Sequence, residues 1–193
     1  MSFPDIKKSV DSRAAALLEY HMSLLGESAA GFVQGSMSYS RERSDSGSSI
    51  KIGYDEKNKF MSKTYDLAFT LRIPEVELGD SFKARLKFRG MKQIDTGFFE
   101  IKPGNETADG LLNDAALVEE IVKCSRSVDL AVVSAEYSSG SRTLNVKAVP
   151  YAGAFMWVKL PPVYYPLKLN SGEMRALLGL MGGVERCLMR KLS

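Results

Sequence analysis

The chain has few of the residues on which common catalytic sites depend. Its 193 residues include one histidine, His21, and two cysteines, Cys124 and Cys187. A zinc site needs several His or Cys ligands at short spacing, and a histidine-dependent triad would have to use His21. The cysteines lie far apart and form no C-x-x-C motif. We therefore expect no metal site, and we interpret the cysteines as buried, reduced thiols and His21 as a half-buried helix residue.

The chain also lacks the short motifs of phosphate binding and nucleophilic catalysis. It contains no G-x-x-x-x-G-K-[ST], G-x-G-x-x-G or G-x-S-x-G sequence. Ser48 and Lys51 have the spacing of an S-x-x-K motif. They fall at a loop-to-strand boundary, however, where a three-residue step puts two side chains on opposite faces. We therefore name no catalytic residue and expect no cofactor. Whether the chain is an enzyme stays open, with a non-enzyme favoured.

Neither net charge nor hydrophobicity is extreme. The chain has Lys+Arg 26 against Asp+Glu 23, a net charge of +3, and 45% hydrophobic residues. A disordered chain would be less apolar, and a nucleic-acid-binding domain usually has a larger basic excess, so nucleic acid is not a favoured partner. No apolar run reaches the about 20 residues of a membrane helix, and the first residues lack the apolar region of a signal peptide. These features predict a soluble, cytoplasmic protein without a transmembrane segment.

Hydrophobic periodicity predicts three helical regions with alternating strands between them. Apolar residues recur at steps of three and four over the ranges 4–25, 106–125 and 171–191. Asn113 is expected to interrupt the second region by capping a new segment, and Gly182-Gly183 to kink the third. Short turns between the strands favour antiparallel pairing. We therefore expect one α+β domain spanning 1–193, a mainly antiparallel sheet with N-terminal, middle and C-terminal helices packed on one face.

Two hairpins are predicted with a specific register. Residues 76–78 and 82–88 are expected to pair around a loop at 79–81, which would set Glu77 opposite Lys83 and Glu75 opposite Arg85. This register favours a salt-bridged surface over an acid–base pair of the two glutamates. Residues 131–135 are expected to pair with 144–148 around a two-residue turn, Ser139-Gly140.

Two features stand above this background. Aromatic residues concentrate in the segment 151–165, at Tyr151, Phe155, Trp157, Tyr164 and Tyr165. The strand within this segment is apolar on both faces, so it either lies inside the core or exposes an apolar face. Basic residues alternate along one strand, at Lys83, Arg85, Lys87 and Arg89. Such a strand either binds anions or forms a solvated face, and Lys87 and Arg89 have no partner in the predicted register.

These features lead to one favoured function and two alternatives. The favoured function is non-enzymatic binding of an apolar small ligand or a protein partner through the aromatic segment, with the C-terminal helix against it. One alternative is a hydrolase without a short motif, using carboxylates that the fold assembles. The other is binding of an anionic surface or nucleic acid through the basic strand 83–89.

Overall fold

The computed structural model describes residues 3–44, 46–89 and 96–192, with the backbone alone for 3–8 and Arg89. The described residues form four α-helices and a short 3-10 helix, η1 (Gly26–Ala29). The α-helices are α1 (Phe3–Ser23), α2 (Glu106–Leu112), α3 (Ala115–Ser125) and α4 (Ser171–Leu192). The strands are β1 (Val33–Gln34), β2 (Ser38–Glu42), β3 (Ser49–Asn58), β4 (Ser62–Ile73), β5 (Phe82–Arg89), β6 (Thr96–Lys102), β7 (Leu130–Ser138), β8 (Thr143–Pro150), β9 (Phe155–Val158) and β10 (Val163–Pro166).

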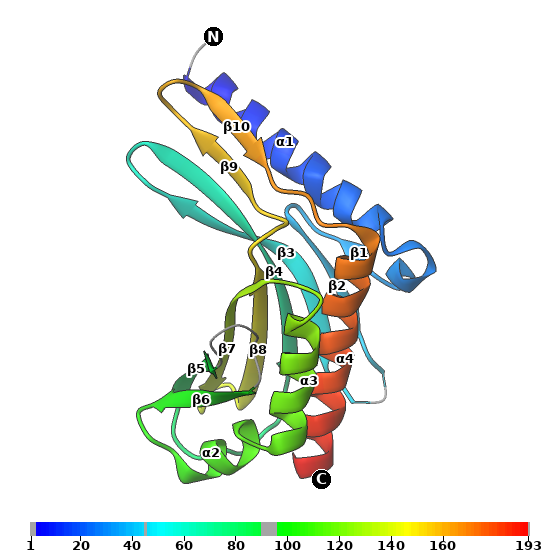
Figure 1. Cartoon of the computed structure of the whole chain (residues 1–193), viewed down its shortest axis with the longest axis vertical. Helices are drawn as coiled ribbons and strands as arrows, with labels where there is room; N and C mark the ends of the chain where they lie inside the picture. The colour runs from blue at the N-terminus through cyan, green and yellow to red at the C-terminus, as the bar shows by residue number, and fades with distance from the viewer. Residues whose placement is uncertain (1–2, 45, 90–95, 193) are drawn as a thin grey trace.

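All ten strands belong to one antiparallel sheet, and β4 is its centre. The main path runs β1-β2-β3-β4-β8-β7-β5-β6. One edge of β4 pairs with β3 along nearly its whole length. Its other edge pairs first with β9, over 62–65, and then with β8, over 69–73. The sheet therefore forks, and β9, β10 and the adjoining halves of β3 and β4 form a separate distal ribbon at one end of the molecule (Figure 1).

The helices cover one face of this sheet, as the sequence predicted. Alternate residues of β4, from Tyr65 to Ile73, are buried on that face. The apolar stripe of α4 packs over the main part together with α3, and α1 lies along the distal ribbon (Figure 1). The opposite face carries exposed side chains such as Lys51, Arg72 and Glu136. The architecture is therefore α+β. None of the helices in the described ranges combines the length and apolar character needed to cross a bilayer.

The hairpin predicted for 76–88 does not form. Residues 74–81 are a connection from β4 to β5, and β5 pairs with β6 and β7 instead. Glu75 adopts a left-handed backbone conformation with φ 59°, which ends the extended path. Val76 and Leu78 are nevertheless buried. Alternating burial thus occurs in a loop whose partners are distant in sequence, and the pattern alone did not distinguish this loop from a strand.

The second predicted hairpin forms with a longer turn. β7 and β8 pair with Ser138 opposite Thr143, so the turn has four residues instead of two. Val133 lies opposite Ala148, which shifts the register by two positions from the prediction. Because side chains alternate with period two, this shift leaves Val133 and Ala135 on their predicted face, whereas Ala131 lies in an irregularity of the ladder between Leu130 and Val132.

The helix expectations hold except at two points. Asn113 caps neither segment with its side chain; its amide accepts from the Phe99 N–H at 2.6 Å and donates to the Phe99 carbonyl at 3.1 Å. At the outer edge of β6, the Asn113 amide therefore bonds the backbone groups of Phe99 as a neighbouring strand would. Helix α4 runs unbroken through Gly182-Gly183. At Gly183 a Cβ would lie 2.5 Å from a Glu120 oxygen, so this glycine serves the close packing of α3 on α4.

Candidate functional site

The structure divides the aromatic segment between the core and the surface. Phe155 and Trp157 of β9 pack against α1 instead of the C-terminal helix expected there from the sequence, and both are buried, Trp157 with 9% of its surface exposed. They form a small cluster with Tyr65 and the α1 residues Val10, Ala14 and Leu17. Tyr164 lies at the edge of this cluster. Tyr151 and Tyr165 are 66% and 47% exposed. Phe155 and Trp157 are thus packed as core, and the exposed part of the segment lies elsewhere on the ribbon.

Helix α1 is fixed to the ribbon by polar contacts around Lys63. This lysine is almost fully buried, and its Nζ lies 2.7 Å from Asp11 Oδ1 and 3.1 Å from Glu56. The Tyr65 hydroxyl also donates to Asp11. Burial alone would lower the pKa of Lys63, but hydrogen bonds with Asp11, Tyr65 and Glu56 outweigh it and hold that pKa above its usual range. The buried ammonium is therefore a charged anchor for α1.

The face of the ribbon opposite α1 is apolar along both of its terminal strands. Side chains alternate along β9 and β10, so the neighbours of the core aromatics point away from α1. The residues on this outer face are Met156 and Val158 of β9, Val163 and Tyr165 of β10, and Leu167 just after it. Met156 lies opposite Tyr165, and Val158 opposite Val163. Tyr165 and Leu167 are exposed, and the other three are half-buried. Strand β9, which is apolar on both faces, therefore has one face in the core and the other accessible to solvent.

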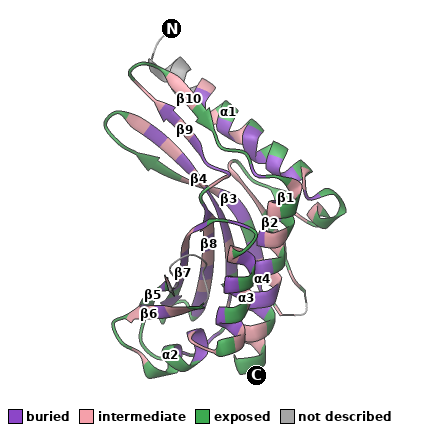
Figure 2. Cartoon of the chain, viewed as in Figure 1, coloured by how far each residue is buried: buried purple, intermediate pink, exposed green. Residues whose placement is uncertain are grey.

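Three more apolar side chains extend from the end of the same ribbon. Phe60 and Met61 form the turn between β3 and β4, and Leu160 lies in the turn between β9 and β10. Phe60 is 90% exposed and Leu160 71%. Figure 2 shows the ends of both hairpins as largely exposed, whereas β4 is largely buried toward the centre of the sheet. We call Phe60, Met61 and Leu160 the tip, and the tip and the outer face together the distal apolar surface.

The basic side chains of β5 point to the face of the main sheet that no helix covers. Lys83 pairs with Glu136 of β7 at 3.0 Å, and Lys87 lies 3.6 Å from Glu100 of β6. Arg85 is exposed opposite Glu100 in the register. The side chain of Arg89 lies outside the described residues. Lys83 thus pairs with Glu136 instead of the predicted Glu77, and Lys87, which was expected to have no partner, lies near Glu100 because β6 is the neighbouring strand. Glu77 instead pairs with Arg142 at 2.7 Å.

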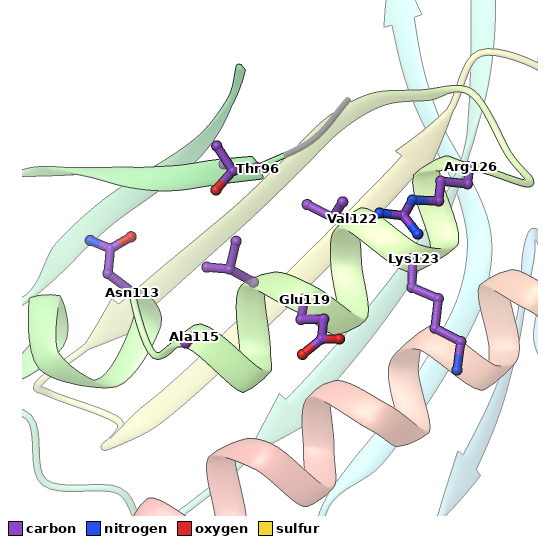
Figure 3. A pocket seen from close by; sticks show the side chains of 9 residues that line it. Thr96, Asn113, Ala115, Glu119, Val122, Lys123 and Arg126 are labelled. Carbon is purple, nitrogen blue, oxygen red and sulfur yellow. The ribbon is translucent and has the colours of Figure 1, made fainter. Parts of the chain in front are cut away.

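A cavity of about 630 Å³ lies between β6 and α3. Figure 3 shows Thr96 of β6 facing Asn113 and the start of α3, with Glu119, Lys123 and Arg126 along the helix. The three charged side chains are exposed and of mixed sign. Four smaller cavities, of about 230 to 440 Å³, are also lined by residues outside 151–165.

A second buried polar cluster holds the loop between β2 and β3 against α4. Glu185 of α4 is buried and pairs with Arg43. Ser46 donates to one of its oxygens at 3.1 Å, and Ser48 donates to the same oxygen. Ser48 has no exposed surface, so a substrate could not reach it. This cluster holds the loop on α4, and the S-x-x-K spacing has no catalytic geometry.

The other reactive side chains are also engaged structurally. His21 is fully buried instead of half-buried, and its Nε2 accepts from the Leu169 N–H at 3.2 Å. Cys124 is buried as expected, and burial raises its pKa to about 11, which suppresses the reactive thiolate, whereas Cys187 is only half-buried. Hydrogen bonds from Lys102 and Lys191 lower the pKa of Glu100 and Asp114, as ion pairing does. Within the described ranges, no three His, Cys, Asp or Glu side chains are placed to hold a metal ion.

Sequence reasoning found the aromatic concentration but missed the tip. Phe60 and Met61 stand between turn residues, at a position where a loop normally carries polar side chains. Two consecutive large apolar residues between the polar residues Lys59 and Ser62 were therefore the available signal. Their proximity to Leu160, about 100 positions along the chain, depends on the pairing of β4 with β9, which local pattern does not reveal.

Comparisons with known proteins identify the family. No curated protein and no solved structure matches the chain. A family model described as "Protein of unknown function (DUF3156)" matches residues 27–188. This range includes the distal hairpins and most of α4, and it begins after α1. Because the match covers most of the sequence, the chain belongs to the DUF3156 family.

Proposed function

We propose that this protein is a non-enzymatic binding domain that docks an apolar ligand or partner through the distal apolar surface. The observation that carries the proposal is the concentration of exposed apolar side chains. Of the eight large hydrophobic side chains exposed in the described residues, five belong to this surface. The five are Phe60, Met61, Leu160, Tyr165 and Leu167. Contiguous apolar patches on a folded domain commonly mark sites of interaction, because exposing them to water is costly.

The position of the surface supports binding to something outside the chain. Helix α1 already covers the opposite face of the same strands, so the outer face is the side still available for burial. Tyr165 offers a large apolar ring with a hydroxyl that can stay hydrated, a combination favoured in interfaces. The aromatic segment 151–165 thus keeps its proposed role through Tyr165, with Phe155 and Trp157 supporting the surface from below. We also infer a cytoplasmic location, which the two free thiols support.

Binding of the apolar dye anilinonaphthalene sulfonate tests this function directly. The native protein should enhance the fluorescence of the dye while remaining folded. Trp157 lies on β9 between Met156 and Val158, so its excitation energy should transfer to dye bound at the outer face. Replacing Val163 and Tyr165 together by serine removes both apolar side chains that β10 contributes to the outer face. We expect this change to weaken dye binding about tenfold or more, given the free energy of apolar burial.

A matched control uses an apolar side chain exposed elsewhere. Val33 of β1 is exposed and lies outside the distal ribbon, and Val33→Ser should leave dye binding unchanged. Thermal unfolding confirms that all variants are folded. The proposal fails if the native protein does not bind the dye, or if the serine variants of the ribbon and of β1 bind it equally.

A further inference from the structure

The tip is a single protruding unit made from two hairpins. The Lys159 N–H donates to the Met61 carbonyl at 2.9 Å, and the Lys159 ammonium donates to the Lys59 carbonyl at 3.2 Å. The turn at Phe60 is closed by the Lys59 N–H, which donates to the Ser62 carbonyl at 2.8 Å. These bonds tie the two turns together. The apolar side chains of the tip are therefore held at the end of an ordered ribbon.

Two lysines flank these apolar side chains, one from each turn. Lys59 is exposed and Lys159 is half-buried. Within the described residues, neither ammonium group forms an ion pair, whereas the next lysines along the ribbon do. Lys57 pairs with Asp66 at 2.6 Å, and Lys63 pairs with Asp11 and Glu56. Positive charge is thus left uncompensated at the turn that also exposes Phe60.

The shape of the tip narrows the choice of partner. Figure 1 shows the two hairpins ending at the distal extremity of the molecule, where they project beyond the main sheet. A protein interface usually buries apolar residues within a broad, closely packed patch. A narrow projection with apolar side chains at its end and lysines beside them suits a bilayer instead. There the apolar groups enter the boundary between headgroups and acyl chains, and the lysines contact anionic headgroups.

We propose that the tip docks this protein on an anionic lipid bilayer, with Phe60, Met61 and Leu160 inserted and Lys59 and Lys159 at the headgroups. This inference rests on the proposed binding function and names its partner class. The protein would bind at the surface of the membrane, through two β-turns. The outer face, with Tyr165, would lie beside the headgroups and extend the contact.

Co-sedimentation with vesicles tests the inference. The native protein should bind phosphatidylcholine vesicles that contain phosphatidylglycerol, and binding to pure phosphatidylcholine should be much weaker. Replacing Phe60 and Leu160 by serine should weaken binding about a hundredfold, because each large apolar side chain contributes about tenfold or more when buried. Replacing Lys59 and Lys159 by glutamine should weaken binding about five- to thirtyfold and reduce its sensitivity to salt. Val33→Ser is the matched control and should bind as the native protein does.

Insertion of the tip into the bilayer can be detected by tryptophan fluorescence. In a Phe60→Trp variant the added tryptophan emission should shift to shorter wavelength when anionic vesicles are added, and brominated lipid should quench it. Trp157 is buried in the core, so the native protein should show no comparable shift. This variant keeps a large aromatic side chain at the turn, so loss of folding does not explain a negative result.

The outcomes separate this inference from the function on which it rests. If the native protein binds the dye but not anionic vesicles, the lipid inference is overturned while the binding function stands. The same holds if light scattering shows that the native protein is a dimer and that replacing Phe60 and Leu160 by serine makes it a monomer, since the tip would then join two copies of the chain. If neither dye nor vesicles bind, both proposals fail. Vesicle binding that the tip serines leave unchanged also overturns the inference.

Discussion

Protonation of His21 should destabilise the fold below neutral pH. The imidazole is fully buried on α1, and its Nε2 accepts a hydrogen bond from the Leu169 N–H. A neutral ring accepting at Nε2 carries its proton on Nδ1. A protonated ring would point an N–H at the Leu169 N–H, so the contact would become repulsive. Burial, with a smaller contribution from the positive charge of Lys168, lowers the pKa of His21 from 6.5 to about 4.

The pKa shift sets both the sign and the size of the effect. Between about pH 6.5 and pH 4 the unfolded chain binds a proton at His21 that the folded chain does not. The free energy of unfolding should therefore be highest above about pH 6.5 and fall as pH approaches 4. The full shift corresponds to about 3 kcal/mol. This is a large fraction of the 5 to 15 kcal/mol, roughly, by which native domains are stable.

Two measurements check this prediction. Because His21 is the only histidine, its imidazole resonance can be followed by NMR without assignment, and it should not titrate in the folded protein until near pH 4. Urea unfolding followed by Trp157 fluorescence should show that His21→Gln loses less stability than the native protein between pH 7 and pH 4.5, by about 2 to 3 kcal/mol. Carboxylates contribute equally to both proteins. A resonance that titrates near 6.5 in the folded state would refute the reasoning.

Further predictions concern packing, the anchor of α1 and the sheet edge. Gly153→Ala should lower the free energy of unfolding by about 2 to 3 kcal/mol, because φ is 88° and the new Cβ would lie 2.7 Å from the side chain of buried Leu67. Gly179→Ala should raise the free energy of unfolding by about 0.5 to 1 kcal/mol, because alanine favours the helix and the position has open space around it. Thermal unfolding measures the effect of both glycine substitutions. Asp11→Ala should lower the free energy of unfolding by about 1 to 2 kcal/mol and speed hydrogen exchange in α1. Adding Lys63→Met should recover part of the loss, because the buried ammonium would otherwise keep only Glu56 as its ion-pair partner. Asn113→Ala should cost about 1 to 3 kcal/mol and expose the β6 amides to exchange; native-like exchange would contradict the role of its amide.

Local chemistry made the helices and most strands predictable. The capping pair of α4 is an example. The Asn170 N–H donates to Glu173 at 2.7 Å, and the Glu173 N–H donates to Asn170 at 2.9 Å, as their three-residue spacing indicated. The face of each strand was also predictable from alternation, even where the β7–β8 register was displaced by two positions.

Strand partners were not predictable in the same way. Lys83 finds Glu136 and Lys87 lies near Glu100, although Glu75 and Glu77 are closer in sequence and satisfy the same charge pattern. The candidate surface has the same limit. Alternation showed that the strand at 155–158 has two apolar faces, but only the position of α1 decides which face is covered. A period-two pattern specifies faces, and long-range packing specifies what covers them.

The forked pairing of β4 has a consequence for when this chain can fold. One edge of β4 needs residues 144–148 and 155–158 as partners, and the helix that covers its main apolar face is α4, the last element. During synthesis β3 and β4 are made before β8, β9 and α4, so Leu71 and Ile73 stay uncovered until α4 has emerged. Contacts between distant residues form slowly, and exposed strands invite association with other chains. We therefore expect folding to complete only after α4 has left the ribosome, and a chain truncated before α4 to aggregate during its production.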